Sequence, residues 1–83
     1  MATYSLRKRS VTVAGHATSF SLEEEFWQDL HRIARQRNLS LNALVSSIDA
    51  SRAGNLSSAL RVFVLECYRS GELLPVEHRI DRH

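Results

Sequence analysis

The sequence predicts a mainly α-helical domain with a short β-ribbon near its N-terminal end. Apolar and polar side chains alternate over residues 9–13 and again over residues 17–22, a period of two that is typical of strands. From residue 23 onwards, apolar residues recur every three or four positions, which is the spacing of an amphipathic helix. Two further segments with this spacing follow, at residues 40–50 and 56–70. We therefore expect two strands followed by three helices.

The two expected strands are joined by a bend at Gly15, and each has an apolar and a polar face. In the first strand Val11 and Val13 lie on one side, because successive side chains of a strand point to opposite faces. Phe20 and Leu22 share one side of the second strand in the same way. The opposite side of the second strand carries small side chains, namely Ala17, Ser19 and Ser21.

Capping residues mark the expected helix ends. The first helix, at residues 23–37, begins with acidic residues, and Ser21 and Glu24 have the spacing of a capping box. Asn38 is suited to the left-handed conformation that ends a helix, and Ser40 is suited to the N-cap of the second helix. A glycine follows the third helix and is expected to end it.

Length and composition predict a small folded protein. The chain has 83 residues, of which 43% are apolar and 24% charged, and a formal net charge of +2. We expect one domain at residues 9–70, between a flexible basic arm at residues 1–8 and a flexible tail at residues 71–83. Because a chain of this size buries only a small core, we expect it to associate with further copies of itself.

Several classes of protein are not expected. The single cysteine, Cys67, excludes an internal disulfide framework and a cysteine-rich zinc site. The sequence has no apolar run long enough to span a membrane and no apolar signal segment near its start, so we expect a cytoplasmic protein. We see no Ser/His/Asp series, glycine-rich phosphate loop or paired carboxylates in an apolar setting, and therefore expect no enzymatic activity, cofactor or metal site.

Four segments are distinctive: Lys-Arg-Ser-Val-Thr-Val at residues 8–13, Gly-His-Ala-Thr-Ser at 15–19, Leu-Glu-Glu-Glu-Phe-Trp at 22–27 and Asn-Leu-Ser-Ser-Ala-Leu-Arg at 55–61. Together they resemble one bacterial branch of the ribbon-helix-helix superfamily, which includes the methionine and Arc repressors. The resemblance implies an intertwined homodimer, or a higher-order assembly, with an extra N-terminal strand and a third C-terminal helix. The dimer core that it implies contains Phe20, Leu22, Phe26, Leu30, Leu44 and Ile48.

The resemblance also implies a DNA-binding transcriptional regulator. In such proteins the strands of two chains pair into a ribbon that enters the major groove of double-stranded DNA. The matching base-reading positions are Ala17, Ser19 and Ser21. Phosphate contacts are expected from the start of the second helix and from the basic arm, namely from Ser40 and Asn42 and from Arg7, Lys8 and Arg9.

A second function stays open, because the reading positions carry no long donor and the extra strand would widen a two-chain ribbon to four strands. In this alternative the dimer does not read DNA, and it senses a small molecule such as an amino acid or binds a partner protein through its third helix. A simpler interpretation is that Asn55 or Ser57 only caps this helix. The candidate effector site is the set of donors around the helix start, Arg52, Asn55, Ser57, Ser58 and Arg61.

Overall fold

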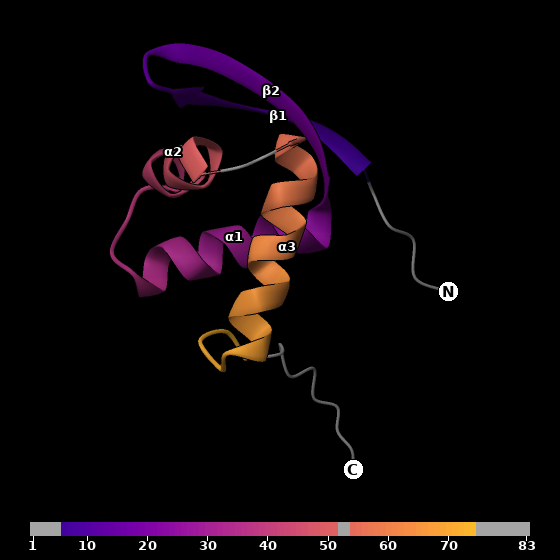
Figure 1. Ribbon diagram of the computed structural model, residues 1–83, viewed down its shortest axis with the longest axis vertical. Coiled ribbons are helices and arrows are strands. Elements are labelled where there is room, and N and C mark those ends of the chain that lie inside the picture. Colours follow the sequence, from indigo (N-terminus) through magenta and orange to yellow (C-terminus); the bar gives the residue numbers. More distant parts are fainter. Residues whose placement is uncertain (1–5, 52–53, 75–83) are drawn as a thin grey trace.

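The computed structural model describes residues 6–51 and 54–74. A β-hairpin lies across one end of a group of three helices (Figure 1), so the expected mainly α-helical fold with a short β-ribbon is confirmed. No helix in the described ranges is long and apolar enough to cross a membrane. In chain order the elements are β1 (Leu6–Val13), β2 (His16–Glu23), α1 (Glu24–Gln36), α2 (Leu41–Ser51) and α3 (Leu56–Arg69).

β1 and β2 form an antiparallel hairpin within one chain, joined by Ala14 and Gly15. Both turn residues have positive φ, 52° at Ala14 and 82° at Gly15, as a tight hairpin turn requires. The register pairs Leu6 with Glu23, so both strands are longer than predicted. β1 begins at Leu6 rather than Arg9, because β2 supplies backbone hydrogen-bond partners even where the side chains of β1 do not alternate. The predicted flexible arm therefore contributes its last residues to the sheet.

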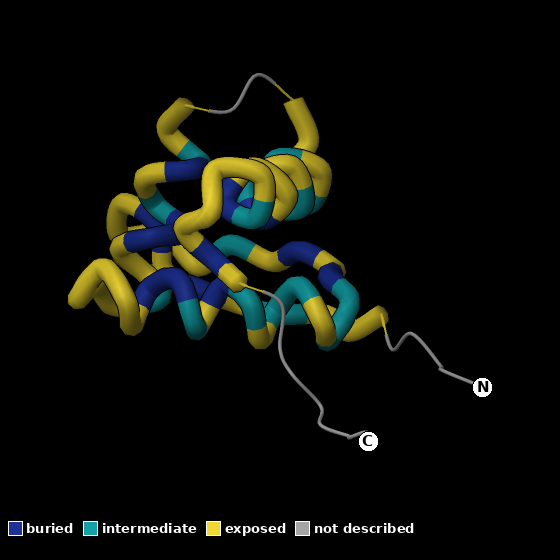
Figure 2. The backbone as a smooth tube through the Cα atoms, turned by 90° about the horizontal axis from the view of Figure 1, so that it is seen from below, coloured by how far each residue is buried: buried dark blue, intermediate teal, exposed yellow. Residues whose placement is uncertain are grey.

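The apolar side of the hairpin covers one side of the core, and the buried positions in Figure 2 lie toward the inside of the molecule. Val11, Val13 and Phe20 are each at most 7% exposed, and Leu22 is fully buried. All three helices add side chains to this core: Leu30, Ile33 and Ala34 from α1, Leu44, Val45 and Ile48 from α2, and Leu56, Leu60, Val64 and Cys67 from α3.

The side chains expected in a dimer core lie in the core of one chain. The strand pairing is also within one chain, so the core does not depend on a strand from a partner. The homodimer stays a prediction. Of the six residues, Phe20, Leu22, Leu30, Leu44 and Ile48 are buried, and Phe26 is partly buried against them.

Most of the expected capping residues occupy the helix ends. The Ser40 hydroxyl accepts a hydrogen bond from the backbone N–H of Ala43 at 3.0 Å, so Ser40 caps α2. The Asn55 side chain accepts one from the N–H of Ser58 at 3.1 Å and caps α3. Asn38, with φ of 58°, follows α1 in the left-handed conformation.

The predicted capping box at the start of α1 is wrong. Glu23 occupies the N-cap position and makes no side-chain capping hydrogen bond. Ser21 lies inside β2, paired with Lys8, and its side chain is exposed. Because β2 continues to Glu23, the N-cap position of α1 falls two residues after Ser21, and Ser21 stays paired in the strand.

The predicted boundary of the tail at residue 71 is too early. Leu73 is fully buried, and its N–H donates to the carbonyl of Cys67 at 3.0 Å. The guanidinium of Arg37 donates two hydrogen bonds to the Glu72 carboxylate, at 2.5 and 2.7 Å. A single leucine after a helix has no periodicity, so this packing leaves no pattern in the sequence.

Candidate nucleic-acid interface

One side of the hairpin faces the helices and the other points away from them (Figure 1). The side that points away carries small and polar side chains. These side chains are exposed, because the apolar partners that alternate with them occupy the side facing the helices. The hydroxyl oxygens of Ser10 and Ser19 lie 3.5 Å apart across the two strands. We define this outward face by its cross-strand pairs, Lys8 with Ser21, Ser10 with Ser19, and Thr12 with Ala17.

The structure brings the three predicted base-reading residues together. Ala17, Ser19 and Ser21 all lie on the outward face and are exposed. Phe20 and Leu22 alternate with them and point into the core. The face assigned to β2 from the alternation of its side chains is therefore the face that the structure exposes.

β1 adds Lys8, Ser10 and Thr12 to the outward face, and none of them was among the predicted base-reading residues. Lys8 was assigned to a phosphate because the predicted strand began at Arg9. The period of two that puts Val11 and Val13 on one side of the strand puts Ser10 and Thr12 on the other side, and Lys8 as well once the strand begins at Leu6. Lys8 supplies the long donor that β2 lacks.

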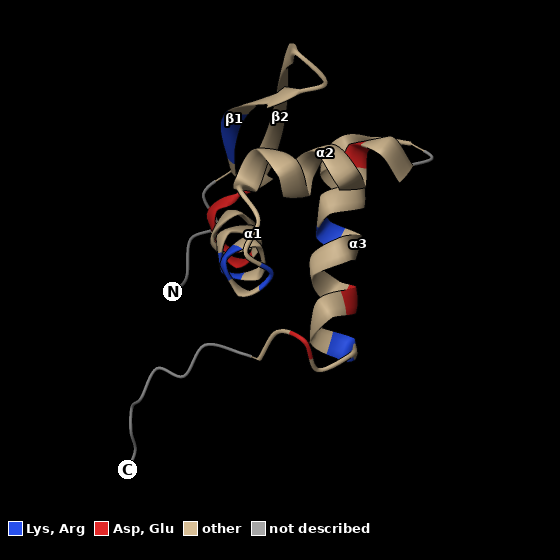
Figure 3. Cartoon of the chain, turned by 90° about the vertical axis from the view of Figure 1, so that its left-hand side faces the viewer, with Lys and Arg blue, Asp and Glu red and all other residues tan. Residues whose placement is uncertain are grey.

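The basic residues of the hairpin lie toward the start of β1 (Figure 3). Arg7 and Arg9 belong to one side of the strand and Lys8 to the other. Arg9 belongs to the inward side, where its guanidinium pairs with the Glu24 carboxylate and lies 4.6 Å from the centre of the Trp27 ring. Its side chain is only 16% exposed, so the predicted phosphate contact of Arg9 is not supported. Arg7, two residues before it, is exposed.

Two of the acidic residues beside the hairpin are neutralised by arginines. The Arg61 guanidinium donates to the Glu23 carboxylate at 2.8 and 3.3 Å, and these hydrogen bonds lower the pKa of Glu23. The pKa of Glu24 is lowered first by a hydrogen bond from Gln28 and then by Arg9. Their repulsion toward a phosphate backbone is therefore reduced.

The start of α2 lies beside β1. The side-chain oxygen of Asn42 accepts a hydrogen bond from the backbone N–H of Thr12 at 3.4 Å. Ser40 and Asn42 are both exposed. The first amides of a helix have no partner within the helix and carry partial positive charge, so this end of α2 is suited to a phosphate.

The family model of the ribbon-helix-helix domain matches residues 6–68, from the start of β1 almost to the end of α3. The chain belongs to the ribbon-helix-helix domain family. A similar solved structure is that of an uncharacterized protein from Bordetella pertussis Tohama I. It has a TM-score of 0.66 and 28% sequence identity, and the match covers 93% of this chain and 68% of that chain. No curated protein matches the chain.

The candidate effector site of this ribbon-helix-helix domain is only partly assembled. Arg52 lies outside the described residues. Asn55 and Ser58 are joined by the capping hydrogen bond of α3, so the side-chain oxygen of Asn55 already has a donor. The simpler interpretation, in which Asn55 is an N-cap, is confirmed.

The other two donors attach α3 to the hairpin. The Ser57 hydroxyl donates to the backbone carbonyl of Ser21 at 2.7 Å, and Arg61 is paired with Glu23. These partners lie 36 and 38 residues apart in the sequence, so sequence patterns did not indicate them. A groove of about 450 Å³ remains between β2 and the start of α3, but these two donors are used within the domain.

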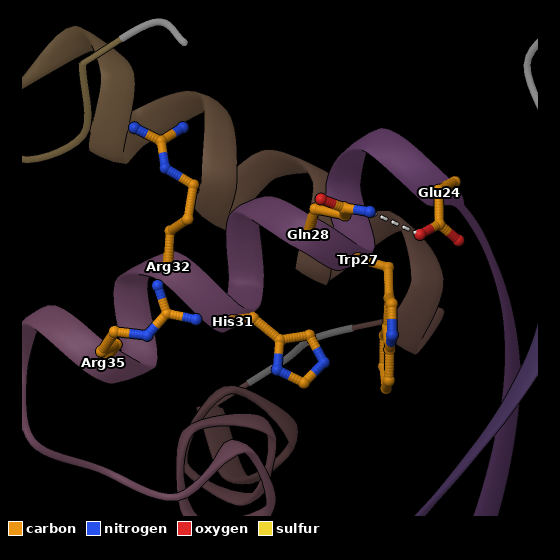
Figure 4. A pocket seen from close by; sticks show the side chains of 6 residues that line it. All are labelled: Glu24, Trp27, Gln28, His31, Arg32 and Arg35. Carbon is orange, nitrogen blue, oxygen red and sulfur yellow. Dashed lines mark hydrogen bonds between the residues drawn. The ribbon is translucent and has the colours of Figure 1, made fainter.

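A second hollow, of about 360 Å³, lies along α1 of the ribbon-helix-helix domain (Figure 4). The rings of Trp27 and His31 meet edge to face with their centres 5.0 Å apart. Gln28 donates to the Glu24 carboxylate at 2.8 Å. None of these groups belongs to the outward face of the hairpin. The lining residues are Glu24, Trp27, Gln28, His31, Arg32 and Arg35.

Proposed function

We propose that the protein is a transcriptional regulator that binds double-stranded DNA with its outward face. The observation that carries this proposal is a two-stranded ribbon whose polar side is left uncovered by the helices. Neighbouring strands lie about 4.8 Å apart, and the major groove, about 12 Å wide, admits a two-stranded ribbon. The hairpin of a single chain therefore has a suitable width without a strand from a second chain.

Both outer edges of the hairpin are engaged by helices, which favours a ribbon from one chain. At the edge of β1, Asn42 accepts a hydrogen bond from the N–H of Thr12. At the edge of β2, Ser57 donates to the carbonyl of Ser21. A strand from another chain would have to displace these contacts. In the homodimer that we continue to expect, each chain would present its own ribbon to one half-site.

Contacts with the DNA backbone would come from the start of α2. Ser40 and Asn42 are exposed there, beside β1, and a helix N-terminus attracts phosphate. Such contacts fix the position of a protein on the duplex without reading its sequence. The arginine partners of Glu23 and Glu24 further support the approach of a phosphate backbone.

The alternative function as a sensor of a small molecule receives less support. A ligand at the start of α3 would need free hydrogen-bond donors, and Ser57 and Arg61 already donate to residues of the hairpin. Binding there would also have to break contacts that hold α3 to β2. We therefore favour DNA binding over the sensing of a small molecule.

Selection of genomic DNA fragments by the purified protein at roughly physiological salt tests the proposal. We expect enrichment of a short recurring motif. Ser19→Glu places a negative charge on the outward face and should abolish this enrichment, because it repels phosphate and removes a contact to the bases. Gln36→Glu adds the same charge at an exposed position on α1 and should leave the enrichment unchanged. Uniform binding that disappears as salt rises would contradict base reading, and equal effects of the two variants would contradict the assigned surface.

A further inference from the structure

Building on the proposed DNA binding, we infer that Lys8 determines sequence specificity by reading a guanine in the major groove. This base contact would come from β1, the strand that precedes the one expected to read DNA. It also replaces the phosphate contact that the sequence alone indicated for Lys8.

The placement of Lys8 separates it from its basic neighbours. It lies on the outward face opposite Ser21, whereas Arg7 and Arg9 belong to the other side of β1. Lys8 is exposed, and its side chain makes no hydrogen bond or ion pair within residues 6–51 and 54–74. Its ammonium group is therefore free to contact a ligand in front of the ribbon.

Glu23 is the acidic residue nearest to Lys8 along the polar side of the hairpin, since it follows Ser21 by two positions in β2. Its carboxylate is held by Arg61 through two hydrogen bonds. Lys8 is thus not neutralised by the carboxylate that shares its side of the sheet. The ion pair between Glu23 and Arg61 keeps a positive charge available at this end of the outward face.

The chemistry of the outward face makes Lys8 its discriminating residue. Lysine donates to the O6 and N7 acceptors of guanine, a combination that no other base presents in the major groove. The serine side chains of the face are short, and a hydroxyl pairs with several bases. Ala17 has no donor or acceptor in its side chain. Lys8 is the only charged residue in the set that defines the outward face.

The spacing of residues along β1 indicates that Lys8 and the Ser10–Ser19 pair would contact different bases. Two residues of an antiparallel strand span about 6.8 Å, which corresponds to roughly two base steps of 3.4 Å. The base beneath Lys8 is therefore different from the base beneath the Ser10–Ser19 pair. Loss of the Lys8 side chain should affect one region of the recognised motif and leave the remainder intact.

The test compares Lys8→Ala with Arg7→Ala in the same selection, followed by measured affinities for the recovered duplex. Each variant loses one exposed positive charge, and the two residues are adjacent in the chain, but only Lys8 lies on the outward face. Lys8→Ala should weaken binding to the motif by between about 5-fold and about 150-fold, and should erase the preference for one guanine. Arg7→Ala should weaken binding to the motif and to a scrambled duplex by equal factors. Lys8→Arg should keep the guanine preference, because arginine makes the same contact.

Replacing the guanine by 7-deazaguanine, which lacks the N7 acceptor, tests the contact itself. The wild-type protein should bind the modified duplex more weakly, and Lys8→Ala should bind modified and unmodified duplexes equally. If Lys8→Ala recovers the wild-type motif and behaves like Arg7→Ala, Lys8 contacts phosphate and the inference fails while DNA reading stands. If the wild-type protein recovers no motif, the proposed function fails and the inference falls with it.

Discussion

Replacing Leu60 with alanine tests whether α3 is part of the core of the domain. Leu60 is fully buried in the middle of α3, with Leu56 and Val64 buried one turn to either side. These neighbours limit the collapse of the structure around a cavity, so the cost should fall within the range of about 2–5 kcal/mol for a buried Leu→Ala change. A domain of this length has a free energy of unfolding of about 4–12 kcal/mol, so the substitution should remove a large part of it.

Urea unfolding, followed by circular dichroism and by the fluorescence of Trp27, measures this loss. Val62→Ala is the matched control, because Val62 lies on the same helix and is 53% exposed. We expect the control to change the free energy of unfolding by no more than about 0.5 kcal/mol. Equal unfolding midpoints for the two variants would refute the packing of α3. A large, concentration-dependent cost for Val62→Ala would show that a partner covers the exposed side of the helix.

Three further predictions concern the ends of the helices. Leu73→Ala should lower the free energy of unfolding by about 2 kcal/mol or more in urea titrations, and an unchanged midpoint would contradict the packing of residues 71–74. Hydrogen bonds from Arg37 lower the pKa of Glu72 below its ordinary 4.5. The pair between Arg37 and Glu72 therefore stabilises the folded state fully above that pH. This stabilisation is lost as the pH falls through the lowered pKa of Glu72 in the folded state. Arg37→Met should weaken this acid dependence in thermal melts, and an unaltered profile would argue against the pair. Ser40→Ala should cost about 1 kcal/mol through the lost cap of α2, and it should also weaken DNA binding. If Ser40→Ala binds DNA with the wild-type affinity, Ser40 does not contact the DNA.

The elements of the fold could be predicted because their side chains follow two different periods. Phe20 and Leu22 alternate with serines, so the buried side of β2 follows from the sequence. The start of β1 could not be found in this way. The apolar Leu6 is exposed and lies on the same side of the strand as the charged Lys8, so apolar and polar side chains do not alternate there. Leu73 was missed for a related reason, because one apolar residue after a helix defines no period.

Only those residues of the candidate site that follow from the alternation of side chains in the strands could be predicted. Alternation placed Ser19 and Ser21 on the exposed side, and it would have placed Lys8 there had the strand been started earlier. The partners of charged residues depend on tertiary distances instead. Arg9 and Arg61 looked free in the sequence, but each is paired with a glutamate that the fold brings beside it.

The most direct test of DNA binding by the outward face is an NMR titration of the ¹⁵N-labelled protein with the duplex recovered in the selection. The backbone amide signals of Lys8, Ser10 and Ser19 should shift, because these residues would lie against the bases. The signals of Arg35 in α1 and Glu66 in α3 should stay in place, since both are exposed but lie outside the outward face. Shifts confined to α1 or α3, with an unperturbed hairpin, would contradict the account.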